Sequence, residues 1–201
     1  MSLYPELDGL NATEMQARFD GPPVDGADSA ATYYTEIAEQ LGVLGELTFL
    51  WDRVGGGDEP HLRALVFALS RHEKDSARVR RWLVGLLAER RGAVLADVID
   101  GLARVHEREV DDNVLRHGQD PSEYVRGAVL RYARNAVPER AFALLSAAAA
   151  DPHFIVRENV ADELAALRDP RGRAVLEGLK TDAHPHVRQA ATSALAELDD
   201  T

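Results

Sequence analysis

Apolar residues recur at three- and four-residue spacing along almost the whole chain after Ala30, and no segment alternates apolar and polar residues as a half-buried strand does. This spacing places the apolar side chains on one face of a helix. Helices of about ten to sixteen residues, separated by turns, are predicted over 59–71, 75–90, 93–105, 107–117, 122–135, 138–149, 153–167, 171–180 and 184–198. The apolar pattern of 93–117 also fits one longer helix. The sequence therefore predicts an all-α fold.

The N-terminal part of the chain differs from the rest. Residues 30–54 carry one apolar stripe that ends at the turn sequence GGGDEP, which predicts a single long helix capping the fold. Residues 1–29 are predicted to be an acidic, partly mobile segment, because 20–29 are rich in Gly, Pro and Asp. The pattern also allows a short helix that starts near Asn11 or Thr13.

Three stretches in the C-terminal half align without gaps at a period of 31 residues. They read DPSEYVRGAVLRYARNA from Asp120, DPHFIVRENVADELAAL from Asp151 and DAHPHVRQAATSALAEL from Asp182. Such a period indicates stacked helical hairpins, because one hairpin cannot bury its apolar stripe alone. The best-defined repeats are 106–135, 137–167 and 169–199.

Each aligned stretch carries an arginine six residues after its aspartate, at Arg126, Arg157 and Arg188. The arginines could form a row of anion-binding groups, but the valine directly before each one and the fixed aspartate favour a structural role. The aspartate can accept hydrogen bonds from the free N–H groups of a helix's first turn, where a proline is also tolerated. Arginines that pair with these carboxylates need no ligand.

The motif DPxxxVRxxA/VxxxL, preceded by a first helix that opens with DPRG or VPER, resembles the HEAT-like repeats, in particular the short phycobilisome-lyase-type HEAT repeats. The resemblance is strong over 120–199 and weaker over 59–117. It implies an α-solenoid of HEAT-like helical hairpins over 59–201. It also implies a hydrogen-bonded ladder from repeat to repeat, formed by Asp120, Asp151 and Asp182 with Arg126, Arg157 and Arg188.

In that family the second helix of each hairpin lines the concave face of the solenoid. The outward positions of these helices differ from copy to copy, whereas the core positions repeat. This division is typical of a shared scaffold with individual recognition. The candidate partner-binding residues on this face are Arg131, Arg134, Glu158, Asp162, Gln189 and Ser193.

Charge is unevenly distributed, with a net −10 in residues 1–60, +5 in 61–91 and −6 in 92–201, which together give −11. The basic patch, residues 61–91, is an alternative site for nucleic acid. The acidity of the rest of the chain opposes nucleic-acid binding, so we expect the patch to contact the acidic N-terminal segment or another protein.

Two further features predict the cellular compartment and the kind of source organism. No basic leader or apolar membrane span stands in the sequence, which predicts a cytoplasmic protein without a membrane partner. Only Lys74 and Lys180 are lysines among 23 basic residues, which suggests a GC-rich bacterial genome.

Candidate chemistry is sparse. The chain has no cysteine, so thiolate zinc sites and cysteine nucleophiles are excluded. Three motifs contain histidines of the kind that bind metals: HPH at 184–186 and HE at 72–73 and 106–107. No acidic residue accompanies the first at ligand spacing, and the HE dipeptides run into charges, unlike the iron-binding dipeptides of the HEAT-like deoxyhypusine hydroxylase. The sequence predicts no metal, no cofactor and no catalytic residue.

These patterns predict a non-catalytic scaffold or adaptor that binds another protein along the concave face. Two alternatives stay open. One is an enzyme or enzyme subunit that acts on a chromophore, as the resemblance to bilin lyases implies. The other is nucleic-acid binding through the basic patch.

Overall fold

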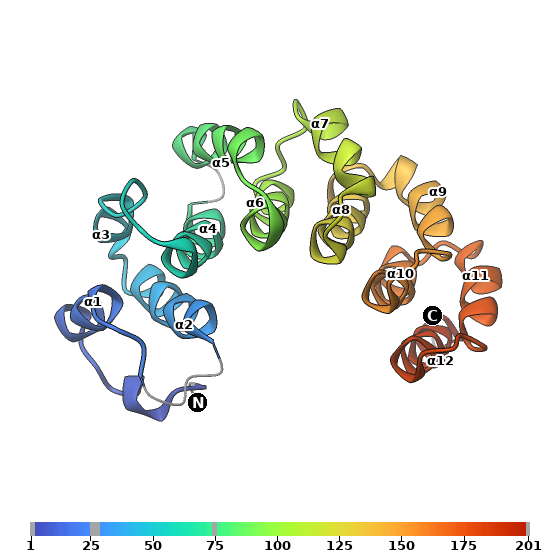
Figure 1. Ribbon diagram of the computed structural model, residues 1–201, viewed down its shortest axis with the longest axis horizontal. Helices are drawn as coiled ribbons and strands as arrows, with labels where there is room; N and C mark the ends of the chain where they lie inside the picture. The colour runs from blue at the N-terminus through green and yellow to red at the C-terminus, as the bar shows by residue number, and fades with distance from the viewer. Residues whose placement is uncertain (1–2, 25–28, 74–75, 200–201) are drawn as a thin grey trace. The chain divides into compact units, whose positions relative to one another are not determined.

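The computed structural model describes residues 3–24, 29–73 and 76–199 (Figure 1). These residues form helices joined by turns, with no strand among them. Two compact units are present, Met1–Glu89, called here the N-terminal unit, and Arg90–Thr201, called here the C-terminal unit. Helix α4, predicted as the first helix of the repeat array, packs against α2 within the N-terminal unit. The predicted all-α fold of helical hairpins is confirmed.

The N-terminal unit is built around aromatic side chains. Its elements are η1 (Pro5–Leu7), α1 (Ala12–Asp20), α2 (Ala30–Val43), α3 (Leu47–Trp51), α4 (Glu59–His72) and α5 (Ala77–Glu89). The buried ring of Phe19 meets Tyr34 and His61 edge to face, at centroid distances of 5.8 and 5.0 Å. Tyr34 stacks on His61 at 3.8 Å. These contacts join α1, α2 and α4.

Residues 3–24 are structured, although the sequence placed them in a partly mobile segment. The side chain of Asn11 accepts the N–H of Glu14, and the Glu14 carboxylate accepts the N–H of Asn11, so a capping box starts α1 where the sequence allowed a short helix. Met15 and Phe19 on this helix are buried. Residues 25–28 of the predicted mobile segment lie outside the described residues.

The prediction of one helix over residues 30–54 is wrong. Helix α2 ends at Val43, and the chain turns through Gly45, whose φ is +83°. The N–H of Glu46 reaches the carbonyl of Leu41, and the N–H of Gly45 reaches that of Gly42. These two bonds form a Schellman motif, which ends a helix at a glycine in the left-handed region. The apolar stripe continues past this break because α3 resumes at Leu47.

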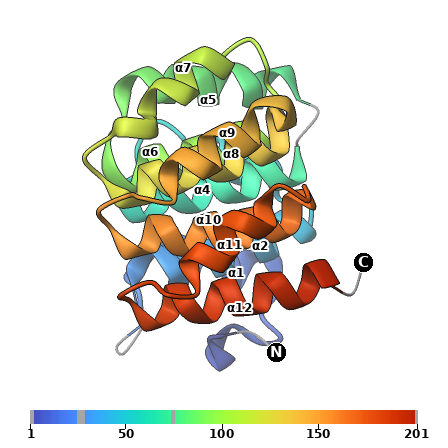
Figure 2. The same cartoon turned by 90° about the vertical axis from the view of Figure 1, so that its right-hand side faces the viewer.

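The C-terminal unit consists of two layers of helices (Figure 1). The first layer contains α6 (Gly92–Arg104), α8 (Glu123–Ala136), α10 (Phe154–Leu167) and α12 (Pro185–Asp199), each packed on the next. The second layer contains α7 (Asp111–Leu115) with η2 (Arg116–Gln119), then α9 (Pro138–Ala148) and α11 (Gly172–Leu179). Figure 2 shows α10, α11 and α12 side by side along their lengths. Between α6 and α7, His106 adopts a φ of 52°, so 93–117 forms separate helices.

The repeat supplies the core of this unit. The aligned valines Val125, Val156 and Val187 are buried, and so is the column of Ala133, Leu164 and Leu195. Fully burying a valine or leucine side chain stabilises the fold by about 1.5–3 kcal/mol. The column of Ala136, Leu167 and Leu198 is buried in its first member and half-buried in the other two.

Close packing of α2 on α4 predicts the effect of a single methyl group. A Cβ atom at Gly42 would lie 2.3 Å from Cδ2 of His72, whose Nε2 is hydrogen-bonded to Glu39 at 3.0 Å. We expect Gly42→Ala to displace this ring and to lower the free energy of unfolding by about 1–3 kcal/mol, measured by urea denaturation.

Gly85 on α5 provides the matched control. A Cβ atom there would meet no atom within 4 Å, so Gly85→Ala should raise the stability by about 0.5–1 kcal/mol through helix propensity alone. If both substitutions changed the stability in the same direction, the proposed clash at Gly42 would be refuted.

Candidate functional site: the ladder and the second-helix face

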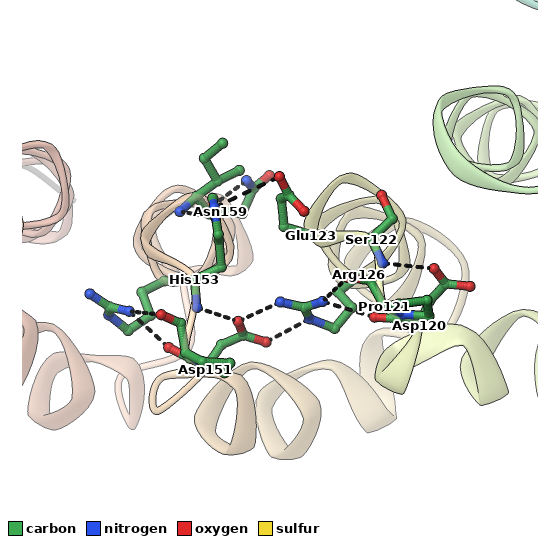
Figure 3. A network of polar contacts seen from close by, with 11 residues as sticks. Asp120, Pro121, Ser122, Glu123, Arg126, Asp151, His153 and Asn159 are labelled. Atoms are coloured by element: carbon green, nitrogen blue, oxygen red, sulfur yellow. Dashed lines mark hydrogen bonds and ion pairs between the residues drawn. The ribbon is translucent and has the colours of Figure 1, made fainter.

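A ladder of arginines and aspartates joins neighbouring hairpins of the C-terminal unit (Figure 3). Nε and Nη2 of Arg126 each donate to one oxygen of the Asp151 carboxylate at 2.8 Å. Nη1 of Arg126 donates to the carbonyls of Asp120 and Pro121 at 2.8 and 3.2 Å. One guanidinium therefore ties the turn before α8 to the turn before α10.

The second rung repeats the first. Arg157 holds the Asp182 carboxylate at 2.7 and 2.8 Å and donates to the carbonyls of Asp151 and Pro152. Arg188 donates to the carbonyls of Asp182 and Ala183 at 2.7 and 2.9 Å, and no carboxylate within 3–24, 29–73 or 76–199 reaches it. The predicted ladder residues thus form two complete rungs and one partial rung, in which Asp120 takes part only through its backbone carbonyl while its carboxylate accepts the N–H of Ser122.

The aspartates act before the helices rather than in their first turns. Oδ1 of Asp151 accepts the N–H of His153, and Asp182 accepts the N–H of His184 in the same way, both at 2.8 Å. This contact closes a local turn, and His153 is the residue that caps α10. The prediction that each aspartate caps the first turn of its helix is therefore wrong, because the N–H that its carboxylate accepts belongs to the residue just before the helix.

Both rungs keep their carboxylates ionised. Hydrogen bonds from Arg157 lower the pKa of Asp182 to about 2. At Asp151, burial acts to raise the pKa, but the bonds from Arg126 and the N–H of His153 outweigh it and leave the pKa below its ordinary value. The guanidiniums of Arg126 and Arg157 have their donors occupied in this way, so they offer no site to an anion.

A second set of polar contacts crosses the second-helix face. This name is used here for the side of α6, α8, α10 and α12 that carries the candidate binding residues Arg131, Arg134, Glu158, Asp162, Gln189 and Ser193. Nε and Nη2 of Arg131 hold the Asp100 carboxylate at 2.9 and 2.8 Å, and Nη1 donates to the side-chain oxygen of Asn159 at 2.7 Å. Arg134 pairs with the buried Glu163. Two of the candidate binding residues are thus bound to the neighbouring helices.

Glu158 and Asp162 lie on the same face of α10 among like charges. Asp162 reaches solvent, and burial together with the neighbouring carboxylates of Glu158, Glu163 and Glu197 raises its pKa. Gln189 and Ser193, the corresponding residues of α12, are exposed. This half of the second-helix face therefore carries negative charge that favours a cation nearby.

Two residues of this face, Tyr124 and Asp100, were not predicted from the sequence. Tyr124 is a large ring left 55% exposed, and it lies one helical turn before Gly127 and two before Arg131 on one stripe of α8. Asp100 stands 31 residues before Arg131, at the same position of the preceding repeat. Opposite charges at one position of neighbouring repeats were the signal that could have identified this pair.

The histidine motifs serve as packing and hydrogen-bonding groups. Phe154 stacks on His184 at 3.6 Å and meets His186 edge to face, and His72 is bonded to Glu39. Glu73 accepts the indole N–H of Trp51 at 3.1 Å. In the part of the chain that the structure describes, no group of three potential metal ligands comes together.

The basic patch is partly engaged within the N-terminal unit. Arg71 pairs with Glu39 of α2 at 2.8 Å, and the guanidinium of Arg78 stacks on Trp51 at 3.8 Å. Outside the patch, Arg53 holds Asp20 of the acidic N-terminal segment at 2.5 Å. Lys74, which the sequence assigned to the patch, lies outside the described residues.

Each unit contains a surface hollow. The hollow in the N-terminal unit has a volume of about 380 Å³, and Arg53, Asp58 and His61 are among its lining residues. Both ring nitrogens of His61 are hydrogen-bonded, one to the carboxylate of Asp58 at 2.6 Å and the other to the carbonyl of Phe19 at 2.8 Å. The other, of about 310 Å³, lies over α8 and is mostly apolar. In the first hollow, the occupied nitrogens leave His61 no position from which to act as a base on a ligand.

Part of the chain matches a known family of repeat proteins. Residues 113–196 match the family model of HEAT repeats, which is the region that carries the two complete rungs. No curated protein sequence matches the chain. No helix among the described residues is long and apolar enough to cross a membrane.

Solved structures support the same fold. A designed armadillo repeat protein in complex with the peptide (KR)4 has a TM-score of 0.58 at 16% identity, covering 94% of this chain and 100% of its own. A second designed armadillo repeat protein has a TM-score of 0.54, with the same identity and coverage. Human deoxyhypusine hydroxylase in complex with glycerol has a TM-score of 0.38 at 15% identity, covering 94% and 96%, which supports no inference. The predicted class, an all-α solenoid of HEAT-like hairpins, is confirmed.

The ladder predicts unequal effects of truncating its arginines. Arg157→Ala leaves the Asp182 carboxylate, whose side chain is 10% exposed, without its bidentate partner, so the free energy of unfolding should fall by about 1–3 kcal/mol. Arg188→Ala removes only bonds to backbone carbonyls and should cost clearly less. Chemical denaturation of both variants measures the difference, and equal losses would contradict a role for the carboxylate.

Acid should weaken the second rung. The pKa of Asp182 is about 2 in the folded protein, against about 3.9 in an unfolded chain, so its contribution to stability is present above pH 4 and is lost as the pH falls towards 2. Between pH 4.5 and 2.5 the unfolding free energy of the unaltered protein should fall by about 2 kcal/mol more than that of the Asp182→Asn variant, which has no carboxylate to protonate at this position. Gly85→Ala, which changes no titratable group, is the control and should leave that fall unchanged.

Proposed function

We propose that the C-terminal unit is a non-catalytic scaffold that binds a partner protein on its second-helix face. The observation that carries the proposal is Tyr124, a ring left 55% exposed on a helix whose core side is well packed. Tyrosine is among the residues that most often dominate the binding energy of an interface, because it buries a large area at low entropic cost.

The charged residues of the same face indicate the partner's character. Arg131 and Arg134 are already paired with Asp100 and Glu163, whereas Glu158 and Asp162 face further carboxylates. A partner segment with Lys or Arg side chains would relieve this repulsion, and one with acidic side chains would add to it. A designed protein of similar fold has a structure in complex with the basic peptide (KR)4, which makes that peptide a suitable first probe.

Assignment to the short phycobilisome-lyase-type HEAT repeats belongs to this proposal and is supported by the 31-residue period and the DPxxxVR motif. The chromophore-related enzyme and the nucleic-acid binder are supported by resemblance and by charge alone. Nothing among the described residues favours either of them over protein binding.

Two substitutions on the face should separate binding from folding. Asp162→Lys replaces a carboxylate that faces Glu158 and Glu163 by a cation, so the protein should become slightly more stable while its affinity for (KR)4 falls about tenfold or more. Tyr124→Ala should weaken binding by a similar factor without loss of stability, because the ring is mostly exposed. Fluorescence anisotropy gives the affinities, and thermal denaturation gives the stabilities.

Two controls complete the test. A peptide in which every Lys and Arg of (KR)4 is replaced by Glu should not bind, and Arg81→Gln, at an exposed residue of α5, should leave the affinity for (KR)4 unchanged. If Asp162→Lys bound the basic peptide as tightly as the unaltered protein does, the second-helix face would not be the binding site.

A further inference from the structure

The last rung of the ladder holds an arginine in position without a carboxylate. Nη1 of Arg188 donates to the carbonyls of Asp182 and Ala183, just as Nη1 of Arg157 donates to those of Asp151 and Pro152. In Arg157 the other edge of the guanidinium, Nε and Nη2, binds an aspartate. At Arg188 that edge meets no carboxylate within 3–24, 29–73 and 76–199.

The two complete rungs define what fits this edge. In each, both oxygens of one aspartate accept from Nε and Nη2. The same aspartate also accepts the N–H two residues further along the chain, from His153 or His184. The ligand of a complete rung is therefore an aspartate in the turn that precedes a helix.

This end of the unit is open to solvent. The side chains of Arg126 and Arg157 are 12% and 15% exposed, whereas Arg188 is an exposed residue. Thr192 is also exposed, although Leu130 and Ala161, at the same position of the two preceding repeats, are buried. The position that is apolar and buried in those repeats is therefore polar and accessible on α12.

We propose that Arg188 is a docking point for an aspartate of a partner protein, presented in the turn before a helix as Asp151 and Asp182 present theirs. The two carbonyls already fix the guanidinium, so binding a carboxylate in the fork geometry costs little further side-chain order. This surface is separate from the second-helix face of the proposed function, and neither depends on the other. Because an exposed pair of this kind is weak alone, it serves as one anchor within a larger contact.

A second copy of the chain is not the expected occupant. The aspartates that stand just before its described helices already have partners on their own chain. Those partners are His61 for Asp58, Ser122 and His117 for Asp120, Arg126 for Asp151, Arg171 for Asp169 and Arg157 for Asp182. A copy would have to break an ion pair to use any of these aspartates except Asp120, whose carboxylate accepts the N–H of Ser122 and lies 3.7 Å from His117. The side chain of Asp120 is 12% exposed, so its own chain largely covers it, whereas another protein can present an uncovered aspartate.

The test measures the side chain of Arg188 directly. The probe is an acetylated and amidated peptide with the sequence of residues 151–160, DPHFIVRENV, titrated into the full chain at millimolar concentration. We expect the 15N resonance of Arg188 Nε to shift. The affinity should fall about threefold when the peptide's aspartate is replaced by asparagine or when Arg188 is replaced by glutamine, because an exposed, charge-assisted pair of hydrogen bonds is lost.

Several results would overturn the proposal. They are no shift of the Nε resonance at the highest peptide concentration, equal binding of the asparagine peptide, or an equal loss of affinity in the control variant Arg81→Gln. A response to inorganic phosphate as large as the response to the peptide would show a general anion site. A dimer detected by light scattering in the unaltered protein and lost in Arg188→Gln would show that a second copy fills the rung.

Discussion

The C-terminal unit depends on the way in which each hairpin is joined to the next by an arginine. Arg126 and Arg157 each bind two carbonyls of their own turn and both carboxylate oxygens of the following one. Charged groups as little exposed as these would destabilise the fold if either partner were missing. Because an unpaired charge here would be destabilising, the two groups must stay paired, and this requirement sets the position of one hairpin against the next.

That constraint separates the residues that build the unit from those that recognise a partner. The ladder and the valine column repeat from copy to copy, so neighbouring helices present corresponding positions side by side. At those positions the chain places Arg131 against Asp100 and leaves Asp162 among carboxylates. Variation on the second-helix face therefore changes its charge without disturbing the scaffold, as a binding surface requires.

Most of the fold could be predicted because its signals are local or periodic. The helices follow from apolar spacing, and the alignment of Asp120, Asp151 and Asp182 identified the hairpins. The break at Gly45 was missed because the apolar stripe continues across it, although a glycine at that point was a readable stop signal. On the face, periodicity located Arg131 and Arg134 but not their partners, since a single sequence does not show which neighbours a long side chain reaches.

By itself, the sequence determined the all-α class, the 31-residue period and the residues of the ladder, because these depend on spacing along the chain. Only the tertiary structure decided which guanidiniums are occupied. Arg131 was predicted to face a partner and is bound to Asp100 and Asn159, whereas Arg188 was predicted to be a rung and holds no carboxylate among the described residues. The physical reason is that an arginine's role depends on which acidic groups the packed hairpins bring within about 3 Å of it.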